Sequence, residues 1–199
     1  MPKLESPFVR QMSADGEAYL VTPEVAESMS WVFDDPTVLA TEKLDGTNVS
    51  IVIENKQIVS IWNRTEQIPF FSKGKSHIVE GVIEAFKRGF CELPDGQHFG
   101  ELIGEKVNGN PLKIQGHLWV PFNTYCREHL AYKSWGKYSK DFETISKWFK
   151  DDLFSLWVRK KGVVQPAEGV VFVQPSTGKM AKLRRDMYAW FEGRKHKGS

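Results

Sequence analysis

The chain predicts an α+β fold in which antiparallel sheets are flanked by helices. Short segments with alternating apolar and polar residues dominate its 199 residues, and two longer segments carry apolar residues at helical spacing. The helical segments lie between groups of strands and do not alternate with single strands, as a parallel sheet would require. Antiparallel pairing follows from this order.

The first clear elements form a hairpin. Apolar residues occupy every second position from Val49 to Ile53, which is typical of a strand with one buried face. Asn55-Lys56 predicts a tight turn, and residues 57–62 return as the second strand. Further strands are predicted over residues 97–103, 117–125, 169–174 and 179–183.

Two helices are predicted between these strands. Residues 76–90 place apolar side chains on one helical face, with Ser76 as the N-cap and Gly89 near the end. A second apolar face begins after Asp141 and extends to Leu153.

Composition excludes several classes of protein. A net charge of +2 is too small for a polybasic nucleic-acid coat, and 41% hydrophobic residues suit one substantial domain. Cys91 and Cys126 have no metal or redox spacing, which favours a reduced compartment. Without an apolar leader or a run of membrane-spanning length, we expect a soluble cytoplasmic protein that does not contact a membrane.

Lys43 is the candidate catalytic residue. It opens the sequence Lys-Leu-Asp-Gly-Thr-Asn just before the first hairpin. A lysine amine attacks a phosphate only when its pKa is lowered, which burial, neighbouring positive charge or a metal ion can do. The Asp45-Gly46 step lets the backbone come close to a ligand. A solvated lysine at a strand end is the alternative interpretation.

Two acidic residues stand beside glycines in apolar strands. Glu101 follows Gly100, and Glu168 precedes Gly169. Buried carboxylates are costly unless they bind a partner, and a nucleoside hydroxyl or a divalent cation would serve. Ordinary exposed acids are the alternative at both positions.

Lys182 and Arg184 are two residues apart, so in a strand they share one face. Two cations on one face neutralise a triphosphate and favour pyrophosphate as leaving group. Arg185 would then point the opposite way. The alternative is a solvated basic strand.

In this order, these segments resemble the covalent nucleotidyltransferase superfamily of ATP-dependent DNA ligases, RNA ligases and mRNA-capping guanylyltransferases. The similarity is greatest to ATP-dependent RNA ligases of the nick-sealing type, and it covers residues 38–186. It implies a nucleotidyltransferase (ATP-grasp-like ligase) fold as a single adenylation domain over residues 1–199, with no C-terminal oligonucleotide-binding-fold domain.

The resemblance implies a role for each matching residue. Lys43 would form lysyl-AMP, Glu168 would bind the metal, and Phe122 would stack on the purine. Residues implied to bind the nucleotide are Glu42, Asp45, Gly46, Asn48, Arg64, Glu101, Phe122, Glu168, Lys182 and Arg184.

The chain departs from the family at two positions. Arg184 stands where the last motif commonly has a second lysine, and Asn123-Thr124 offers no acid beside the aromatic residue. The turn-rich segment from Glu105 to Pro111 is expected near the nucleotide or the nucleic acid.

The implied cofactors are ATP and Mg²⁺ or Mn²⁺, and the implied partner is RNA or a nicked duplex with a 5′-phosphate and a 3′-hydroxyl. We expect a monomer that uses a second domain or protein in trans. The basic stretches Arg159-Lys160-Lys161 and Arg194 to Lys197 are candidates for backbone phosphate contacts, with solubilising surface charge as the alternative.

Other functions remain open at this point. A DNA ligase or a capping-type enzyme would use the same lysine chemistry with a different nucleotide or acceptor. A nucleic-acid-binding module could retain the fold without catalysis, although such a module has no need of Lys43, Glu101, Glu168 and Lys182 together.

Overall fold

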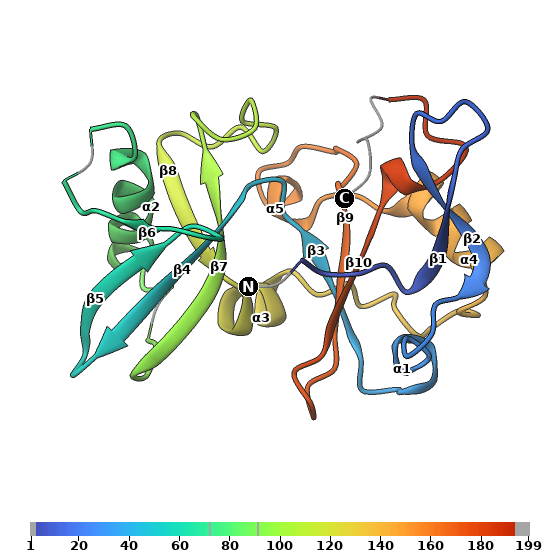
Figure 1. Cartoon of the computed structure of the whole chain (residues 1–199), viewed down its shortest axis with the longest axis horizontal. Helices are drawn as coiled ribbons and strands as arrows, with labels where there is room; N and C mark the ends of the chain where they lie inside the picture. The colour runs from blue at the N-terminus through green and yellow to red at the C-terminus, as the bar shows by residue number, and fades with distance from the viewer. Residues whose placement is uncertain (1–2, 72, 91, 194–199) are drawn as a thin grey trace. The chain divides into compact units, whose positions relative to one another are not determined.

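The computed structural model describes residues 3–71, 73–90 and 92–193 (Figure 1). Cys91 and the basic stretch from Arg194 to Lys197 lie outside these residues. The described chain divides into two compact units. Unit 1 comprises residues 44–130, and unit 2 comprises residues 3–43 and 131–193.

Unit 1 is built on a five-stranded antiparallel sheet with the order β6-β5-β4-β7-β8. Its strands are β4 (Thr47–Glu54), β5 (Gln57–Trp62), β6 (Gln67–Ile68), β7 (Gly96–Gly104) and β8 (His117–Pro121). The helix α2 (Ser76–Lys87) packs on β7 and β8 through its buried residues Ile78, Gly81, Val82 and Ala85.

The predicted hairpin turn is confirmed. Asn55 and Lys56 adopt φ values of +50° and +61°, as expected for the two-residue turn that suits twisted strands. The carboxylate of Asp95 accepts hydrogen bonds from both backbone N–H groups, at 2.7 and 3.0 Å. The turn conformation predicted from the local sequence is therefore also stabilised by the side chain of Asp95, which is distant in sequence.

Unit 2 contains a three-stranded antiparallel sheet with the order β10-β9-β3 and a two-stranded hairpin. The sheet strands are β3 (Leu39–Lys43), β9 (Gly169–Val173) and β10 (Met180–Arg184), and the hairpin strands are β1 (Phe8–Met12) and β2 (Tyr19–Val25). Its short α-helices are α1 (Trp31–Asp34), α4 (Phe142–Lys147) and α5 (Leu156–Arg159). Thus the predicted α+β class with antiparallel sheets is confirmed.

One face of the three-stranded sheet forms the core of unit 2. Alternate residues of its strands are buried there, namely Ala40, Val170, Phe172, Ala181 and Leu183. Phe149 and Tyr188 belong to the same core, with their rings 5.4 Å apart. The opposite face carries Thr41, Lys43, Lys182 and Arg184 beside apolar residues such as Val171.

Two local predictions are wrong, and a third is correct for a helix but not for its type. Lys75, which has no capping side-chain bond, precedes α2, and Ser76 is already its first residue. The strand from His117 ends at Pro121, because residues Phe122–Cys126 form a π-helix that buries Cys126 and continues into α3 (Arg127–His129). The helix after Asp141 is α-helical only to Lys147 and continues as a π-helix over Trp148–Asp152.

The aromatic and apolar residues that suggested these elements do pack inward. Their spacing could not reveal the change of helix type, since helix-period patterns tolerate small changes of pitch. Asp141 is the N-cap of α4, because its carboxylate accepts the Thr144 N–H at 2.8 Å. None of the helices within the described ranges is long and apolar enough to span a membrane.

Trp119 offers a test of the unit 1 core. It is fully buried on β8, and its indole N–H donates to the Val49 carbonyl of β4 at 3.0 Å. We expect Trp119→Phe to lower the free energy of unfolding by roughly 2–4 kcal/mol, because it removes a buried hydrogen bond and leaves a cavity. Denaturant unfolding measures the loss.

Trp62→Phe is the matched control. The Trp62 indole is half-buried and donates to Ser60 Oγ on its own strand, so the change should cost about 1 kcal/mol or less. Equal losses in the two variants would contradict the assigned role of Trp119.

Candidate functional site

In the three-stranded sheet, Lys43 and Arg184 both pair with Gly169. Gly169 of β9 pairs with Lys43 of β3 on one side and with Arg184 of β10 on the other. Directly opposed residues of antiparallel strands project to the same face, and two strand spacings separate the outer pair by about 10 Å. Lys43 and Arg184 therefore flank Gly169 on the face opposite to the core.

Gly169 has no side chain because there is no room for one. A Cβ atom at this position would lie 2.2 Å from the Leu183 carbonyl oxygen and 2.8 Å from Arg184 Cα. Both contacts are to backbone, which cannot yield without breaking the strand pair. The glycine thus permits the close pairing that sets the two cations on either side of it.

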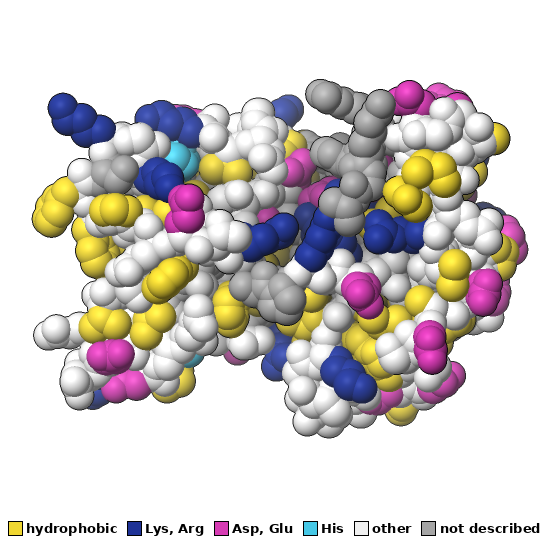
Figure 2. Space-filling view, viewed as in Figure 1, with side chains coloured by type: hydrophobic (Ala, Val, Ile, Leu, Met, Phe, Trp, Pro, Cys, Tyr) yellow, Lys and Arg dark blue, Asp and Glu magenta, His cyan; other side chains and the backbone are white. Residues whose placement is uncertain are grey.

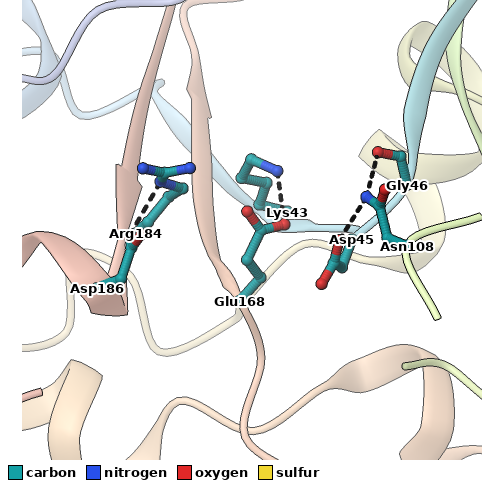
Figure 3. A network of polar contacts seen from close by, with 7 residues as sticks. All are labelled: Lys43, Asp45, Gly46, Asn108, Glu168, Arg184 and Asp186. Atoms are coloured by element: carbon teal, nitrogen blue, oxygen red, sulfur yellow. Dashed lines mark hydrogen bonds and ion pairs between the residues drawn. The ribbon is translucent and has the colours of Figure 1, made fainter. Parts of the chain in front are cut away.

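Glu168 completes this part of the site. Its Oε2 atom lies 2.6 Å from the Lys43 Nζ atom, and both side chains are about one-fifth exposed, at 22% and 21% (Figure 3). Glu168 lies immediately before β9, and its carbonyl accepts the Arg185 N–H at 3.0 Å. The predicted metal-binding acid is therefore in direct contact with the predicted nucleophile.

Lys182 lies on the same strand face as Arg184, as their spacing predicted. It is half-buried, and burial together with the positive charges of Arg184, Lys43, Lys3 and Arg10 lowers its pKa to about 8. In the view of Figure 2, Lys and Arg side chains gather over the region that contains β1, β3 and β10 in Figure 1. The crowding of cations shows a site suited to an anion with several charges.

Glu168 and Asp186 partly neutralise this positive charge. Glu168 pairs with Lys43, and Asp186 Oδ1 lies 3.0 Å from Arg184 Nε (Figure 3). The second contact is an ion pair whose orientation falls outside hydrogen-bond geometry. Asp186 was not anticipated from the sequence, because no motif or spacing marks it.

Arg185 lies just beyond β10, so strand alternation does not set its direction. It begins a 3₁₀-helix (Arg185–Met187), and its guanidinium donates to the Phe149 carbonyl at 2.7 Å. The strand ends at Arg184, so the alternation of side chains ends there as well. Arg185 supports the second π-helix instead of extending the basic face.

Glu42 lies on the other side of the sheet from Lys43. It is 3% exposed, and its carboxylate accepts hydrogen bonds from the Ser155 hydroxyl and from the Trp157 N–H, the latter at 2.8 Å. Burial raises the pKa of Glu42, and these hydrogen bonds oppose the increase. The carboxylate therefore anchors β3 to the start of α5, and a nucleotide contact for Glu42 stays a prediction.

In unit 1, the residues after Lys43 form a second group. Asn48 of β4 is directly opposite Glu101 of β7, so their side chains share a face. Gly46 lies beside Glu101, because a Cβ atom at Gly46 would lie 2.7 Å from Glu101 Cγ and 2.4 Å from the Leu102 carbonyl oxygen. The close approach expected of Gly46 is thus made to β7.

Asn108 joins the β7–β8 loop to the turn before β4. Its Nδ2 atom donates to Asp45 Oδ1 and to the Gly46 carbonyl oxygen, at 2.8 Å each (Figure 3). The turn-rich segment from Glu105 to Pro111 was expected near the site, but Asn108 itself was not singled out. Its partners are more than sixty positions away in the chain, at separations of 63 and 62 residues.

Arg64 and Phe122 lie elsewhere in unit 1. Arg64 is exposed in the turn between β5 and β6, where the Asn63 side chain accepts the N–H groups of Thr65 and Glu66 at 2.9 and 2.7 Å. Phe122 is the first residue of the π-helix and is partly buried. Their predicted contacts with phosphate and purine stay predictions.

The donors for a metal ion are few. Among the described residues, no group of three or more His, Cys, Asp or Glu side chains is placed to hold one. Glu168 alone nevertheless fits Mg²⁺, which keeps several waters and binds through one or two carboxylates and the phosphates of a substrate. The residues are therefore compatible with a metal that arrives with a nucleotide.

The model of the RNA ligase family matches residues 36–184, about three-quarters of the chain. This segment contains all the residues predicted for the site, from Glu42 to Arg184. The chain therefore belongs to the RNA ligase family. None of the curated proteins compared with it matches.

The solved structures that the chain is similar to include RNA ligase from Naegleria gruberi. With its pyrophosphate-containing structure the chain shares 18% identity over 77% of its own length and 51% of that chain, at a TM-score of 0.48. Two mutant structures of that ligase, one with AMP and Mn and one with ATP and Mn, have TM-scores of 0.49 and 0.47 and identities of 16% and 15%. Each match covers 91% of this chain and 59% of the Naegleria gruberi chain.

The chain thus spans between half and three-fifths of these structures. Since their TM-scores are below 0.5, the family assignment rests on the family model and on the residues it contains.

Lys182 gives a pH-dependent test of the crowded cations. Its pKa is about 8 in the folded protein and 10.5 ordinarily, so the unfolded chain binds more protons between these values. Stability should therefore rise as the pH increases from about 8 to about 10.5. The charged lysine costs stability below this range, and Lys182→Met should remove both the cost and the rise.

The measurement is the difference in unfolding free energy between wild type and Lys182→Met, from about pH 7 to about pH 11. Lys179→Met, at an exposed turn lysine, serves as the control. A difference for Lys182→Met that does not change with pH would contradict the crowding of positive charge.

Proposed function

We propose that this chain is the adenylation region of an ATP-dependent RNA ligase that seals 5′-phosphate to 3′-hydroxyl ends through a lysyl-AMP intermediate on Lys43. The contact between Lys43 Nζ and Glu168 Oε2, at 2.6 Å and beside the cations of β10, is the observation that carries the proposal. Membership of the RNA ligase family supports it.

Lys43 supplies the nucleophile. Its Nζ atom attacks the α-phosphorus of ATP, an N–P bond forms, and the bond from that phosphorus to the bridging oxygen of the β-phosphate breaks. Pyrophosphate leaves with the electron pair of the broken bond, and the amine gives up a proton. Because Glu168 Oε2 contacts Nζ in the structure, Glu168 is placed to orient the amine and to accept that proton.

Lys182 and Arg184 neutralise the phosphates. They lie on the Lys43 face of the sheet, where charge builds up on the departing pyrophosphate. A bound divalent cation would add charge neutralisation next to Glu168. Anion binding also favours the charged form of Lys182, whose pKa of about 8 is lowered by burial and by the neighbouring cations.

Sealing would follow in two exchanges. The AMP group passes from Lys43 to the 5′-phosphate of the polynucleotide, and the 3′-hydroxyl then displaces AMP to form the new phosphodiester bond. We propose RNA or a nicked duplex as the partner, a monomeric enzyme, and a second domain or protein that assists the later steps.

A DNA ligase or a capping-type enzyme would share the first step and differ in nucleotide or acceptor. A binding module without catalysis would keep the fold alone. Glu168 at 2.6 Å from Lys43, with Lys182 and Arg184 on the same sheet face, favours an enzyme over that module.

Covalent labelling tests the proposed reaction. Incubation with α-³²P-labelled ATP and Mg²⁺ should leave label on the denatured protein, and Lys43→Ala should abolish it because no other group replaces the nucleophile. Lys179→Ala, at an exposed turn, should label like wild type. Labelling by GTP in place of ATP would point to the capping-type alternative.

Failure to label with either nucleotide, across several divalent metals and pH values, would refute an enzyme of this class. A labelled protein can then be given nicked duplexes with RNA or DNA on each side of the break. Efficient sealing only of all-DNA nicks would overturn the choice of RNA.

Salt dependence tests the basic stretch Arg159-Lys160-Lys161, which is exposed at the end of α5. If it binds backbone phosphates, replacing all three with Ala should reduce the slope of log K against log salt by about 2–3. Polynucleotide binding across a salt titration measures the slope.

Replacement of the exposed residues Lys133, Lys137 and Lys147 in the same unit is the charge-matched control. Equal slopes for the two triple variants would remove the α5 stretch from the interface.

A further inference from the structure

The loop between β7 and β8 is closed by its own hydrogen bonds. The Glu105 N–H donates to the Gly116 carbonyl at 3.0 Å, and the Gly116 N–H donates to Glu105 Oε1 at 3.1 Å. Further along, Asn110 accepts the Ile114 N–H and donates to the Ile114 carbonyl, at 2.8 Å each. The loop is therefore a built structure that can hold a side chain in place.

Asn108 extends from this loop to the turn between Lys43 and β4. Its amide nitrogen has two N–H groups, and the structure uses the atom for two contacts, with the Asp45 carboxylate and with the Gly46 carbonyl. Asn108 has a φ of +48°, a backbone conformation that Asn tolerates better than most residues. Both the backbone preference and the side-chain donors thus favour Asn at this position.

The other contacts of the Asp45–Gly46 turn position its backbone. Leu44 is buried at 3% exposure, and Gly46 lies against the Leu102 carbonyl with no room for a Cβ atom. These contacts place the chain but do not orient the Asp45 carboxylate. The donor atom of Asn108 contacts the carboxylate and the next carbonyl together, so it fixes one relative to the other.

The turn is covalently close to the proposed nucleophile. Asp45 follows Lys43 by two residues, and consecutive Cα atoms are 3.8 Å apart, so their Cα atoms are separated by no more than about 7 Å. Productive attack needs the reacting groups within a narrow range of positions. A turn that changes its conformation here would move the groups that follow the nucleophile in sequence.

We infer that Asn108 is a positioning residue for nucleotidyl transfer to Lys43, acting through the Asp45–Gly46 turn. The inference rests on the proposed function, since it assigns Asn108 to the same reaction. Asn108 takes no part in bond making. It keeps the Asp45 carboxylate and the Gly46 carbonyl in one arrangement, and without it both groups would turn toward water.

The test is a double-mutant cycle between Asn108 and Asp45, read by the single-turnover rate of lysyl-nucleotide formation. In the wild-type background, Asn108→Asp sets two carboxylates against each other and should slow labelling by about 10- to 100-fold. In an Asp45→Asn background, the new amide can donate to the carboxylate introduced at position 108, which removes the repulsion, but the Gly46 carbonyl still loses its donor. There the change should cost about three- to tenfold, less than in the wild-type background.

Asn108→Leu removes both donors at similar size and should also slow labelling about 10-fold. It should lower the urea midpoint of unfolding as well, because it removes two hydrogen bonds and Leu tolerates a φ of +48° less well than Asn. Asn110→Ala is the control for general loosening of the loop, because it removes the bonds to Ile114 and leaves the Asn108 side chain intact. Asn110→Ala should lower the urea midpoint of unfolding, but its labelling rate should stay close to that of wild type.

Each result decides the question. A cost of Asn108→Asp that is clearly smaller in the Asp45→Asn background than in wild type supports the positioning role. Equal costs in the two backgrounds, or wild-type labelling by Asn108→Leu, would overturn it while leaving the proposed function intact. A wild-type protein that takes no label would overturn both.

Discussion

The backbone pairing of β3, β9 and β10 is the constraint on which the candidate site depends. Gly169 is paired on both sides, and the absence of a Cβ atom lets Leu183 and Arg184 approach its backbone. A shift of one residue in either pair would carry Lys43 or Arg184 to the core face, because side chains alternate along a strand. The apolar residues of the core face oppose such a shift. Packing on one face therefore fixes the positions of Lys43 and Arg184 on the other.

The same sheet separates structural and reactive charges. Glu42 and Lys43 are neighbours in sequence but project to opposite faces, and the Glu42 carboxylate accepts hydrogen bonds from Ser155 and Trp157. On the other face, Lys43 pairs with Glu168 while Lys182 remains crowded by positive charge. On the core face, the Glu42 carboxylate is used in hydrogen bonds that stabilise the fold. On the other face, the clustered positive charges are available to bind an anion.

Much of this could be predicted from local sequence. The Asn55-Lys56 turn, the Asp141 cap and the shared face of Lys182 and Arg184 follow from turn, capping and alternation rules that involve only near neighbours. The failures occur where distant packing decides. The π-helix after Pro121 forms where Cys126 is buried against the unit 1 sheet, and nothing in the alternation of residues 117–125 marks that change.

By itself, the sequence determined the identity and order of the charged motif residues, the period of most strands, and membership of the RNA ligase family. Only the tertiary structure decided which of those residues meet. Lys43 and Glu168 are separated by 125 positions, and Asn108 reaches Asp45 across 63. The physical reason is that strand propensity and alternation are local, whereas pairing partners depend on how all strands bury their apolar faces together.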